Sequence, residues 1–307
     1  MKTAVLAESE TRAAQAVLAD AGGRLAAYVA LTKPRIAVMV LVTVATGFLL
    51  GARGASHPST MLLTLLGTGL VAGGASAWNQ YIERSRDQQM RRTAGRPLPS
   101  GRLAPVEAAA FGTALTVAGL AILALGVNLM ATAVALATFV LYVAVYTPMK
   151  PYTTLNTAVG AVPGALPPVI GWAAATGQLG AEAWAMFLIV FLWQFPHFLA
   201  IAWIYRDDYA RAGYRMLPTV DPRGAITGRQ AAGYALALIP AGLLPAVVGL
   251  AGAFYFVGAL GLGAFYLFYA VRFWSKVDDL SARHLLRASF VYLPAILMLL
   301  LLNPMPA

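Results

Sequence analysis

Nine long apolar runs constrain the fold of this chain more than any other feature of its sequence. They lie near residues 36–53, 60–81, 105–125, 129–147, 155–174, 183–204, 232–250, 253–271 and 286–303. A helix needs about 20 mostly apolar residues to cross the hydrocarbon core of a bilayer, and helices satisfy their own backbone polar groups in lipid. The sequence therefore predicts an all-α polytopic membrane protein with nine transmembrane helices around a central cavity.

The composition agrees with that class and excludes several kinds of chemistry. Apolar residues make up 60% of the chain and charged residues only 11%, whereas soluble domains carry about 25% charge. The chain has no cysteine, which excludes disulfides and thiolate catalysis. Residues 1–30 lack the apolar core of a signal peptide, so we expect a partly disordered cytoplasmic arm there and one transmembrane domain over residues 31–307.

The placement of basic residues predicts the orientation in the membrane. With the N-terminus inside, every one of the 22 lysines and arginines except Arg53 falls in a cytoplasmic segment, as the positive-inside rule requires. An odd number of spans then puts the C-terminus outside. This asymmetry explains the net charge of +10 without a nucleic-acid partner. The two long inner loops, roughly 82–104 and 205–231, place the expected chemistry at the cytoplasmic face.

The second apolar run ends in a polar stripe. Asn79, Glu83 and Asp87 recur every fourth residue, and this spacing drifts only about 40° per step around a helix. Carboxylate and amide oxygens are ligands that Mg²⁺ accepts, and acids at the end of a membrane helix indicate a functional site. Three arginines that can grip phosphate follow the stripe: Arg91, Arg92 and Arg96. The alternative is a solvated helix end whose arginines touch anionic lipid.

A second acidic pair follows the sixth run. Asp207 and Asp208 are flanked by arginines, beginning with Arg206, and the set again indicates metal plus phosphate. Adjacent residues on a helix diverge by about 100°, so we expect one aspartate to bind metal and the other to pair with an arginine. The alternative is a solvated loop.

These motifs resemble those of a known family. Asn79…Glu83…Asp87 followed by Arg91-Arg92…Arg96-Pro97 is similar to the first acidic motif of the UbiA-type intramembrane prenyltransferase superfamily. Further stretches resemble its heme-modifying branch, the protoheme IX farnesyltransferases, and run in order from about residue 31 to 218. They are Leu31-Thr32-Lys33-Pro34-Arg35, Tyr146-Thr147…Lys150, Gly164-Ala165-Leu166-Pro167-Pro168, Trp193-Gln194…Pro196-His197-Phe198 and Asp208-Tyr209…Met216-Leu217-Pro218.

The resemblance implies a reaction and a set of site residues. The reaction is transfer of a farnesyl group from farnesyl diphosphate to a vinyl group of heme B, a substrate rather than a cofactor, giving heme O for haem-copper oxidases. The implied catalytic residues are Asn79, Glu83, Asp87 and Asp208, and the implied ligands of two Mg²⁺ ions bridging the diphosphate are Asn79, Glu83, Asp87, Asp207 and Asp208. The implied substrate-binding residues are Lys33, Arg35, Arg91, Arg92, Arg96, Lys150, His197, Arg206 and Tyr209.

The resemblance also implies a location and partners. A multi-pass enzyme in the bacterial inner (plasma) membrane would draw both substrates from the bilayer and could meet a heme A synthase or oxidase assembly proteins. Two positions depart from the superfamily pattern. Glu83 stands where many members have aspartate, and Tyr205 and Tyr209 stand where quinone-type members have spaced aspartates. The tyrosines favour the heme branch.

The sequence leaves two interpretations open for each of two residues, His197 and Lys150. His197 lies inside an apolar run, where it is either a hydrogen-bonded core histidine or a contact to the heme iron or substrate. Lys150 is the only basic residue of its loop. It is interpreted either as a contact to phosphate or as a charge that only fixes the membrane topology. His57 and His284 are expected in solvated connections.

Two other functions remain open from the residues alone. A related prenyltransferase would act on an aromatic acid or quinone precursor. A secondary transporter would carry polar groups near the middle of the membrane, whereas the acids here crowd the predicted cytoplasmic helix ends. The pattern therefore favours an enzyme.

Overall fold

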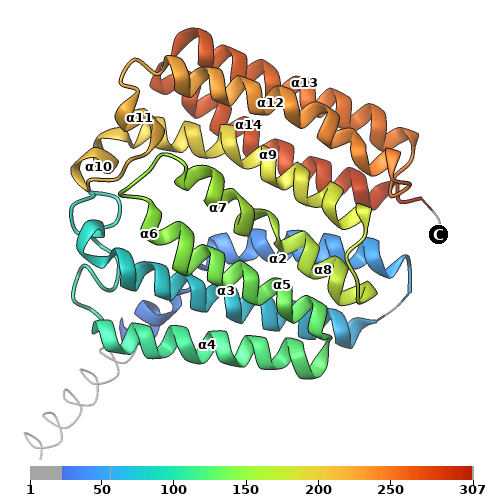
Figure 1. Cartoon of the computed structure of the whole chain (residues 1–307), viewed down its shortest axis with the longest axis horizontal. Coiled ribbons are helices and arrows are strands. Elements are labelled where there is room, and N and C mark those ends of the chain that lie inside the picture. The colour runs from blue at the N-terminus through green and yellow to red at the C-terminus, as the bar shows by residue number, and fades with distance from the viewer. Residues whose placement is uncertain (1–22, 56, 306–307) are drawn as a thin grey trace, which may run out of the picture.

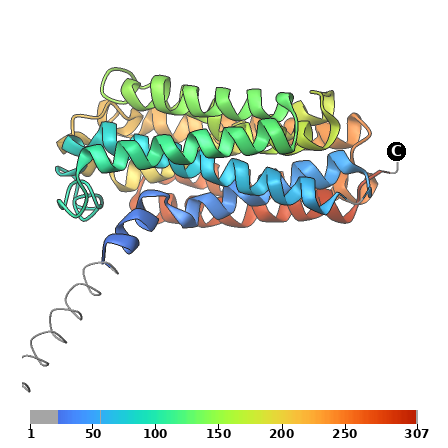
Figure 2. The same ribbon diagram turned by 90° about the horizontal axis from the view of Figure 1, so that it is seen from below.

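The computed structural model describes residues 23–55 and 57–305. Within those residues the chain is helical, and nine helices are long and apolar enough to cross a membrane, which confirms the predicted number. Most of the predicted N-terminal arm lies outside the described residues, and its last part, residues 23–30, is helical. The described part of the chain begins at one end of the bundle and finishes at the other (Figure 2), as an odd number of spans requires.

Seven spans are single helices and two are composite. The single helices are α2 (Pro34–Ala52), α3 (Pro58–Asp87), α4 (Pro105–Gly126), α9 (Ala181–Ile204), α12 (Ala225–Val247), α13 (Ala253–Lys276) and α14 (Asp279–Leu302). The composite spans are α5 (Leu129–Val140) with the π-helix η1 (Leu141–Tyr146) and α6 (Thr147–Met149), and α7 (Asn156–Ala165) with α8 (Pro167–Thr176). Two short helices, α10 (Arg206–Arg211) and α11 (Leu217–Val220), lie in the loop after α9.

Polar residues in the first two turns move two helix starts away from the predicted positions. α12 begins at residue 225 and α14 at residue 279, before the apolar runs that were predicted from 232 and 286. Asp221 accepts a hydrogen bond from the Thr227 amide at 2.7 Å, and Asp278 accepts one from the Ser281 amide at 2.7 Å. Such caps satisfy backbone donors that have no partner within the helix. His284 therefore lies inside α14 and not, as predicted, in a connection.

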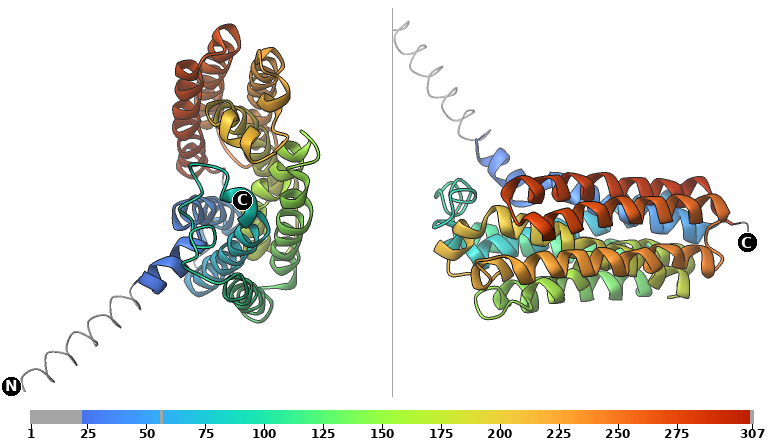
Figure 3. Two further views of the ribbon diagram at one scale, coloured as in Figure 1. Left: turned by 90° about the vertical axis from the view of Figure 1, so that its left-hand side faces the viewer. Right: turned by 90° about the horizontal axis from the view of Figure 1, so that it is seen from above.

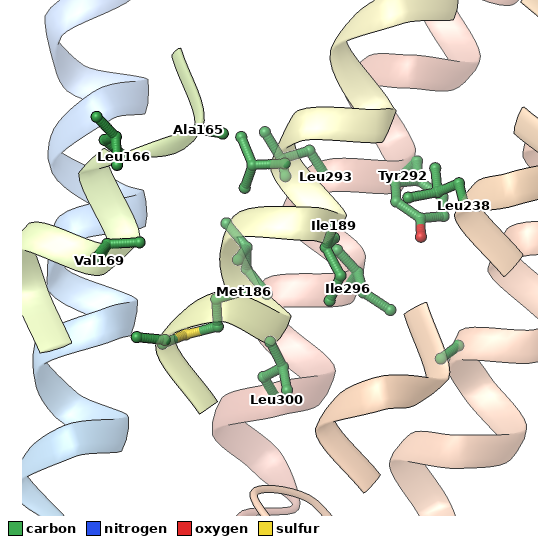
Figure 4. Packing of buried hydrophobic residues seen from close by; sticks show 14 of the residues in the cluster. Ala165, Leu166, Val169, Met186, Ile189, Leu238, Tyr292, Leu293, Ile296 and Leu300 are labelled. Atoms are coloured by element: carbon green, nitrogen blue, oxygen red, sulfur yellow. The ribbon is translucent and has the colours of Figure 1, made fainter. Parts of the chain in front are cut away.

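The spans run side by side and close into a ring. α3 packs on α4, α2 on α8, and α9 on both α12 and α14, while α14 also meets α2, so that the first and last spans are neighbours. Figure 1 shows the spans side by side, and the end-on view in Figure 3 shows the two halves of the bundle. Met186 of α9 extends toward Val169 of α8, and Ile189 of α9 lies beside Ile296 of α14 (Figure 4); Met186 and Ile189 are almost fully buried.

Glycines let α2 and α8 approach closely. A Cβ on Gly171 would lie 1.9 Å from the carbonyl oxygen of Val44, and one on Gly47 would lie 2.0 Å from that of Pro168. Small residues at such crossings let backbones meet in a membrane, where packing rather than hydrophobicity drives association. The contact fixes α2, and with it the segment before α2, against the rest of the ring.

We predict that Gly171→Ala destabilises the fold by about 1–3 kcal/mol, the usual cost of overpacking, because the obstructing atom belongs to a backbone. The matched control is Gly233→Ala in α12, where a Cβ meets nothing within 4 Å; there the helix gains up to about 1 kcal/mol from the loss of glycine. Thermal unfolding of both variants in detergent measures the difference. Equal midpoints would contradict the close approach.

Candidate active site

The polar stripe lies on the last turns of α3 and is buried. Asn79, Glu83 and Asp87 are 1%, 6% and 0% exposed, so all three face the protein rather than solvent or lipid. A buried charge is costly unless it is paired. The burial therefore excludes a merely solvated helix end and requires partners for both carboxylates.

One basic side chain holds each member of the stripe, and each comes from a different place in the chain. Lys33 precedes α2, Lys150 follows α6, and Arg96 lies in the loop after α3. The bonds are Lys33 Nζ to Asn79 Oδ1 at 2.9 Å, Lys150 Nζ to Glu83 Oε1 at 2.5 Å, and Arg96 Nη1 to Asp87 Oδ2 at 2.7 Å. Three cations therefore converge on one buried helix face.

Lys33 reaches Asn79 of α3 from an unusual backbone conformation immediately before Pro34. A residue before proline is hindered in the right-handed helical region, and Lys33 has φ 49° and ψ 61°, the left-handed region. Burial lowers the pKa of the Lys33 ammonium to about 7, and the neighbouring cations Arg96 and Lys150 act in the same direction. An anion bound beside these cations would favour the charged ammonium.

The π-helix η1 positions the next cation. Pro148 cannot donate a backbone hydrogen bond and would clash with a carbonyl one α-helical turn back, and a wider π turn relieves this conflict. The Thr147 hydroxyl donates to the Tyr142 carbonyl at 2.8 Å and accepts from Asn79 Nδ2 at 3.2 Å. The turn thereby fixes both the stripe and Lys150, three residues further on.

Tyrosine rings enclose the Lys150 ammonium. Lys150 Nζ lies 4.6 Å from the centroid of the Tyr146 ring and 5.9 Å from that of Tyr214. Burial lowers the pKa of Lys150, but the Glu83 carboxylate and the phenol groups outweigh it and raise the pKa well above its ordinary value. The ammonium therefore stays charged in this pocket.

The stripe has the donors for one hard cation. Oδ1 of Asp87 is buried without a hydrogen-bond partner among the described residues, although such an atom costs about 1–3 kcal/mol when left unpaired. Mg²⁺ commonly takes one or two carboxylates and completes its shell with phosphate oxygens and water. Over residues 23–55 and 57–305 no three histidine, cysteine or acidic side chains come together, so the protein would supply only part of the shell.

The two long loops contact each other through arginines from the first. Arg92 Nη2 donates to the Tyr209 hydroxyl at 3.1 Å, and its guanidinium lies 4.8 Å from the Tyr205 ring centroid. Arg86 Nη1 donates to the Ala212 carbonyl at 3.1 Å. Tyr205 and Tyr209, which depart from the superfamily pattern, are thus the residues that contact the Arg92 guanidinium.

The second acidic pair separates as adjacent residues on a helix must. Asp208 is 9% exposed and forms an ion pair with Arg211, whereas Asp207 is exposed. Arg206 Nη1 lies 2.7 Å from both the Trp203 carbonyl and Asp279 Oδ1. One aspartate does pair with an arginine, as expected, and Arg206 is directed to α14 rather than to the stripe.

The remaining predicted residues lie apart from this cluster. Arg35 and Arg91 are exposed, and neither has a hydrogen bond to another described residue. His197 lies in α9 and bonds to Ser289 of α14. Four residues that take part in these contacts were not among the predicted site residues: Thr147, Tyr142, Tyr214 and Ser289. Thr147 stands in a stretch already recognised through the resemblance, whereas Ser289 carries no signal in the sequence.

The described residues form nine spans in a ring, with a buried acidic stripe and converging cations at one end, which is the architecture of an intramembrane protein with a polar site. The chain matches the UbiA prenyltransferase family over residues 40–301, and it belongs to that family. Two curated relatives are each called protoheme IX farnesyltransferase. The one from Solibacter usitatus is 50% identical over 285 residues and the one from Salinibacter ruber is 44% identical over 276; each match covers 90% of this chain and 98% of the relative.

Solved structures share the fold at low sequence identity. A digeranylgeranylglyceryl phosphate synthase structure superposes with a TM-score of 0.77 at 16% identity, covering 91% of this chain and 98% of that one. A UbiA homologue from Archaeoglobus fulgidus bound to DMAPP and Mg²⁺ gives a TM-score of 0.64 at 17% identity, covering 89% of this chain and 98% of its own. The chain is thus a multi-pass membrane prenyltransferase.

We predict that Arg92→Ala loosens the second loop, because it removes the hydrogen bond to Tyr209 and the contact with Tyr205. Hydrogen–deuterium exchange over residues 205–216 should become several-fold faster. Gln89→Ala serves as the control, because among the described residues the Gln89 side chain bonds only to the Ser85 carbonyl in its own segment, at 3.4 Å. Unchanged exchange in Arg92→Ala would show that the two loops are held together by other contacts.

Proposed function

We propose that the protein transfers a farnesyl group from farnesyl diphosphate to a vinyl group of protoheme IX, giving heme O. The observation that carries the diphosphate half of this proposal is the convergence of three cations on a buried stripe with a free Asp87 oxygen. The acceptor follows from the relatives called protoheme IX farnesyltransferase, at up to 50% identity.

The stripe is the proposed diphosphate site. Asn79, Glu83 and Asp87 would hold one Mg²⁺, which neutralises the leaving group when it is bound. Lys33, Lys150 and Arg96 would then turn from the stripe to the phosphate oxygens, for which arginine offers a bidentate fork. Arg91 and Arg92 stand behind them on the same loop. A second Mg²⁺ is expected at Asp207 and Asp208. Its binding would require that the ion pair between Arg211 and Asp208 break.

The proposed reaction exchanges one carbon–oxygen bond for a carbon–carbon bond. The allylic carbon separates from the diphosphate oxygen, which keeps the electron pair, and the terminal vinyl carbon bonds to the allylic carbon. Water adds to the other vinyl carbon and loses a proton, which leaves a hydroxyethylfarnesyl group on the porphyrin. The cations around the stripe stabilise the departing anion, while aromatic rings such as that of Tyr146 offer a weak cation–π contact to the allylic cation.

The second candidate acceptor is an aromatic acid or quinone precursor. A second metal site built from spaced aspartates would support such an acceptor. This chain has Tyr205 and Tyr209 at those positions, and both hold Arg92. The heme acceptor is therefore favoured, with a guanidinium where the other branch would have carboxylates.

The proposed location is the inner (plasma) membrane of a bacterial cell, with the N-terminus and the stripe on the cytoplasmic side. The basic residues of the two long loops support this orientation by the positive-inside rule. Curated relatives from bacteria support the kind of membrane. A heme A synthase or an oxidase assembly protein would receive the product.

The acceptor is tested by incubating purified protein with heme B, farnesyl diphosphate and Mg²⁺. Mass analysis should show the hydroxyethylfarnesyl adduct of heme, and chelation of the metal should abolish it. Prenylation of a phenolic acid, with none of heme, would transfer the proposal to the second acceptor.

The diphosphate site is tested separately with Glu83→Ala and Asp87→Ala. Each should slow diphosphate release by roughly 10²-fold or more, since each removes stabilisation of developing negative charge, and each should still insert into membranes. Glu182→Ala is the matched control, because Glu182 starts α9 at the opposite end of the bundle and pairs with Arg53 at 3.3 Å. Full turnover by both stripe variants would refute the metal assignment.

A further inference from the structure

One residue of α14 fastens two aromatic side chains of α9. Nδ1 of His197 lies 2.7 Å from the Ser289 hydroxyl oxygen, and the Trp193 indole N–H donates to the Ser289 carbonyl at 3.0 Å. The imidazole stacks on the Trp193 ring with centroids 4.9 Å apart and planes at 24°. Ser289 is fully buried and His197 is 8% exposed. The imidazole is therefore fixed in both position and plane.

The serine also determines which imidazole nitrogen carries the proton. The Ser289 hydroxyl lies 2.6 Å from the Leu286 carbonyl oxygen. A carbonyl oxygen only accepts, so the single hydroxyl proton is donated there. The Ser289 oxygen must then accept from His197, which places the proton on Nδ1 and a free electron pair on Nε2.

Nε2 is the unused end of this chain of hydrogen bonds. No described residue gives it a hydrogen bond, and it is not one of the fully enclosed unpartnered atoms, unlike Nδ1 of His284. Two phenylalanine rings stand edge-on to the imidazole, Phe198 at 5.3 Å and Phe290 at 5.4 Å between centroids. An accessible nitrogen electron pair in an aromatic wall suits a large, flat, metal-bearing ring.

We propose that Nε2 of His197 binds the iron of the porphyrin acceptor as an axial ligand, and that Ser289 is the positioning residue that sets its tautomer. This inference rests on the proposed function. A ligating histidine usually donates its other ring N–H to a neighbouring acceptor, which fixes the ring and raises its basicity, and the Nδ1–Ser289–Leu286 relay supplies that arrangement here. A hydrogen-bonded core histidine would leave no role for an accessible Nε2.

The depth of His197 fits this role. It lies in the last part of α9, before Ile204, and seven residues of helix span about 10 Å. The loop after α9 contacts the loop after the stripe through Arg92 and Tyr209, so both sites lie toward the same end of the bundle. A porphyrin anchored there can direct a vinyl group toward the prenyl chain whose diphosphate lies at the stripe.

The test compares porphyrins with and without iron, on the purified full-length protein in detergent. Ferric heme B should give the absorption and EPR signature of histidine ligation and bind at least tenfold more tightly than metal-free protoporphyrin IX. His197→Ala should lose the signature and the preference for iron, and added imidazole should restore the signature. Ser289→Ala should weaken heme binding about tenfold, in the range for loss of a ligand's hydrogen-bond partner, while Ser289→Thr should retain it.

The chain has only three histidines, so a histidine–iron signature can be assigned to one of them by single substitutions. His284→Ala, on the same helix as Ser289, is the control and should leave the spectrum unchanged. An unchanged signature in His197→Ala would overturn the ligation even if wild-type protein farnesylates heme. A wild-type affinity in Ser289→Ala would overturn the role of the serine. If wild-type protein prenylates only a phenolic acid, the proposed function itself is refuted, and the proposed roles of His197 and Ser289 are refuted with it.

Discussion

The rest of the site depends on the buried pairing of three cations with one face of α3. Two carboxylates and an amide in a low-dielectric interior need such partners, and Lys33, Lys150 and Arg96 supply them at 2.9, 2.5 and 2.7 Å. Because the three cations come from distant segments, each pair also fixes a loop or helix junction. The same cations are the groups that a diphosphate needs, so the substrate would exchange one set of anionic partners for another without rebuilding the site.

The pairing of these cations with α3 accounts for two unusual local conformations. Lys33 is one of three non-glycine residues with positive φ in the described chain, and η1 is the one π-helix among the named elements. Both would cost energy in an ordinary helix bundle, and such strain persists only where surrounding contacts enforce it. Here each of them directs one lysine to α3, which links backbone irregularity to the placement of charge.

Sequence reasoning reached the spans and the stripe because both depend on local periodicity. Apolar length predicts membrane helices, and a four-residue repeat places Asn79 and Asp87 on one face whatever surrounds them. It could not reach the pairing of Lys150 with Glu83, 67 residues apart, because partner choice is decided by tertiary packing. The early start of α12 was missed for a related reason, since its first two turns contain Arg229 and Gln230 and are stabilised by the hydrogen bond from the Thr227 amide to Asp221.

The two proposed sites would divide the reaction by polarity. The cations at the stripe would bind the diphosphate, whereas an iron porphyrin needs an apolar wall with a single polar contact. Placing His197 about two to three helical turns inside α9 keeps Nε2 away from the lysines and arginines, where a competing proton or anion would occupy it. The prenyl chain would then span the interval between the two sites. The Ser289 relay therefore matters only if heme is the acceptor, because a phenolic acceptor needs no axial ligand.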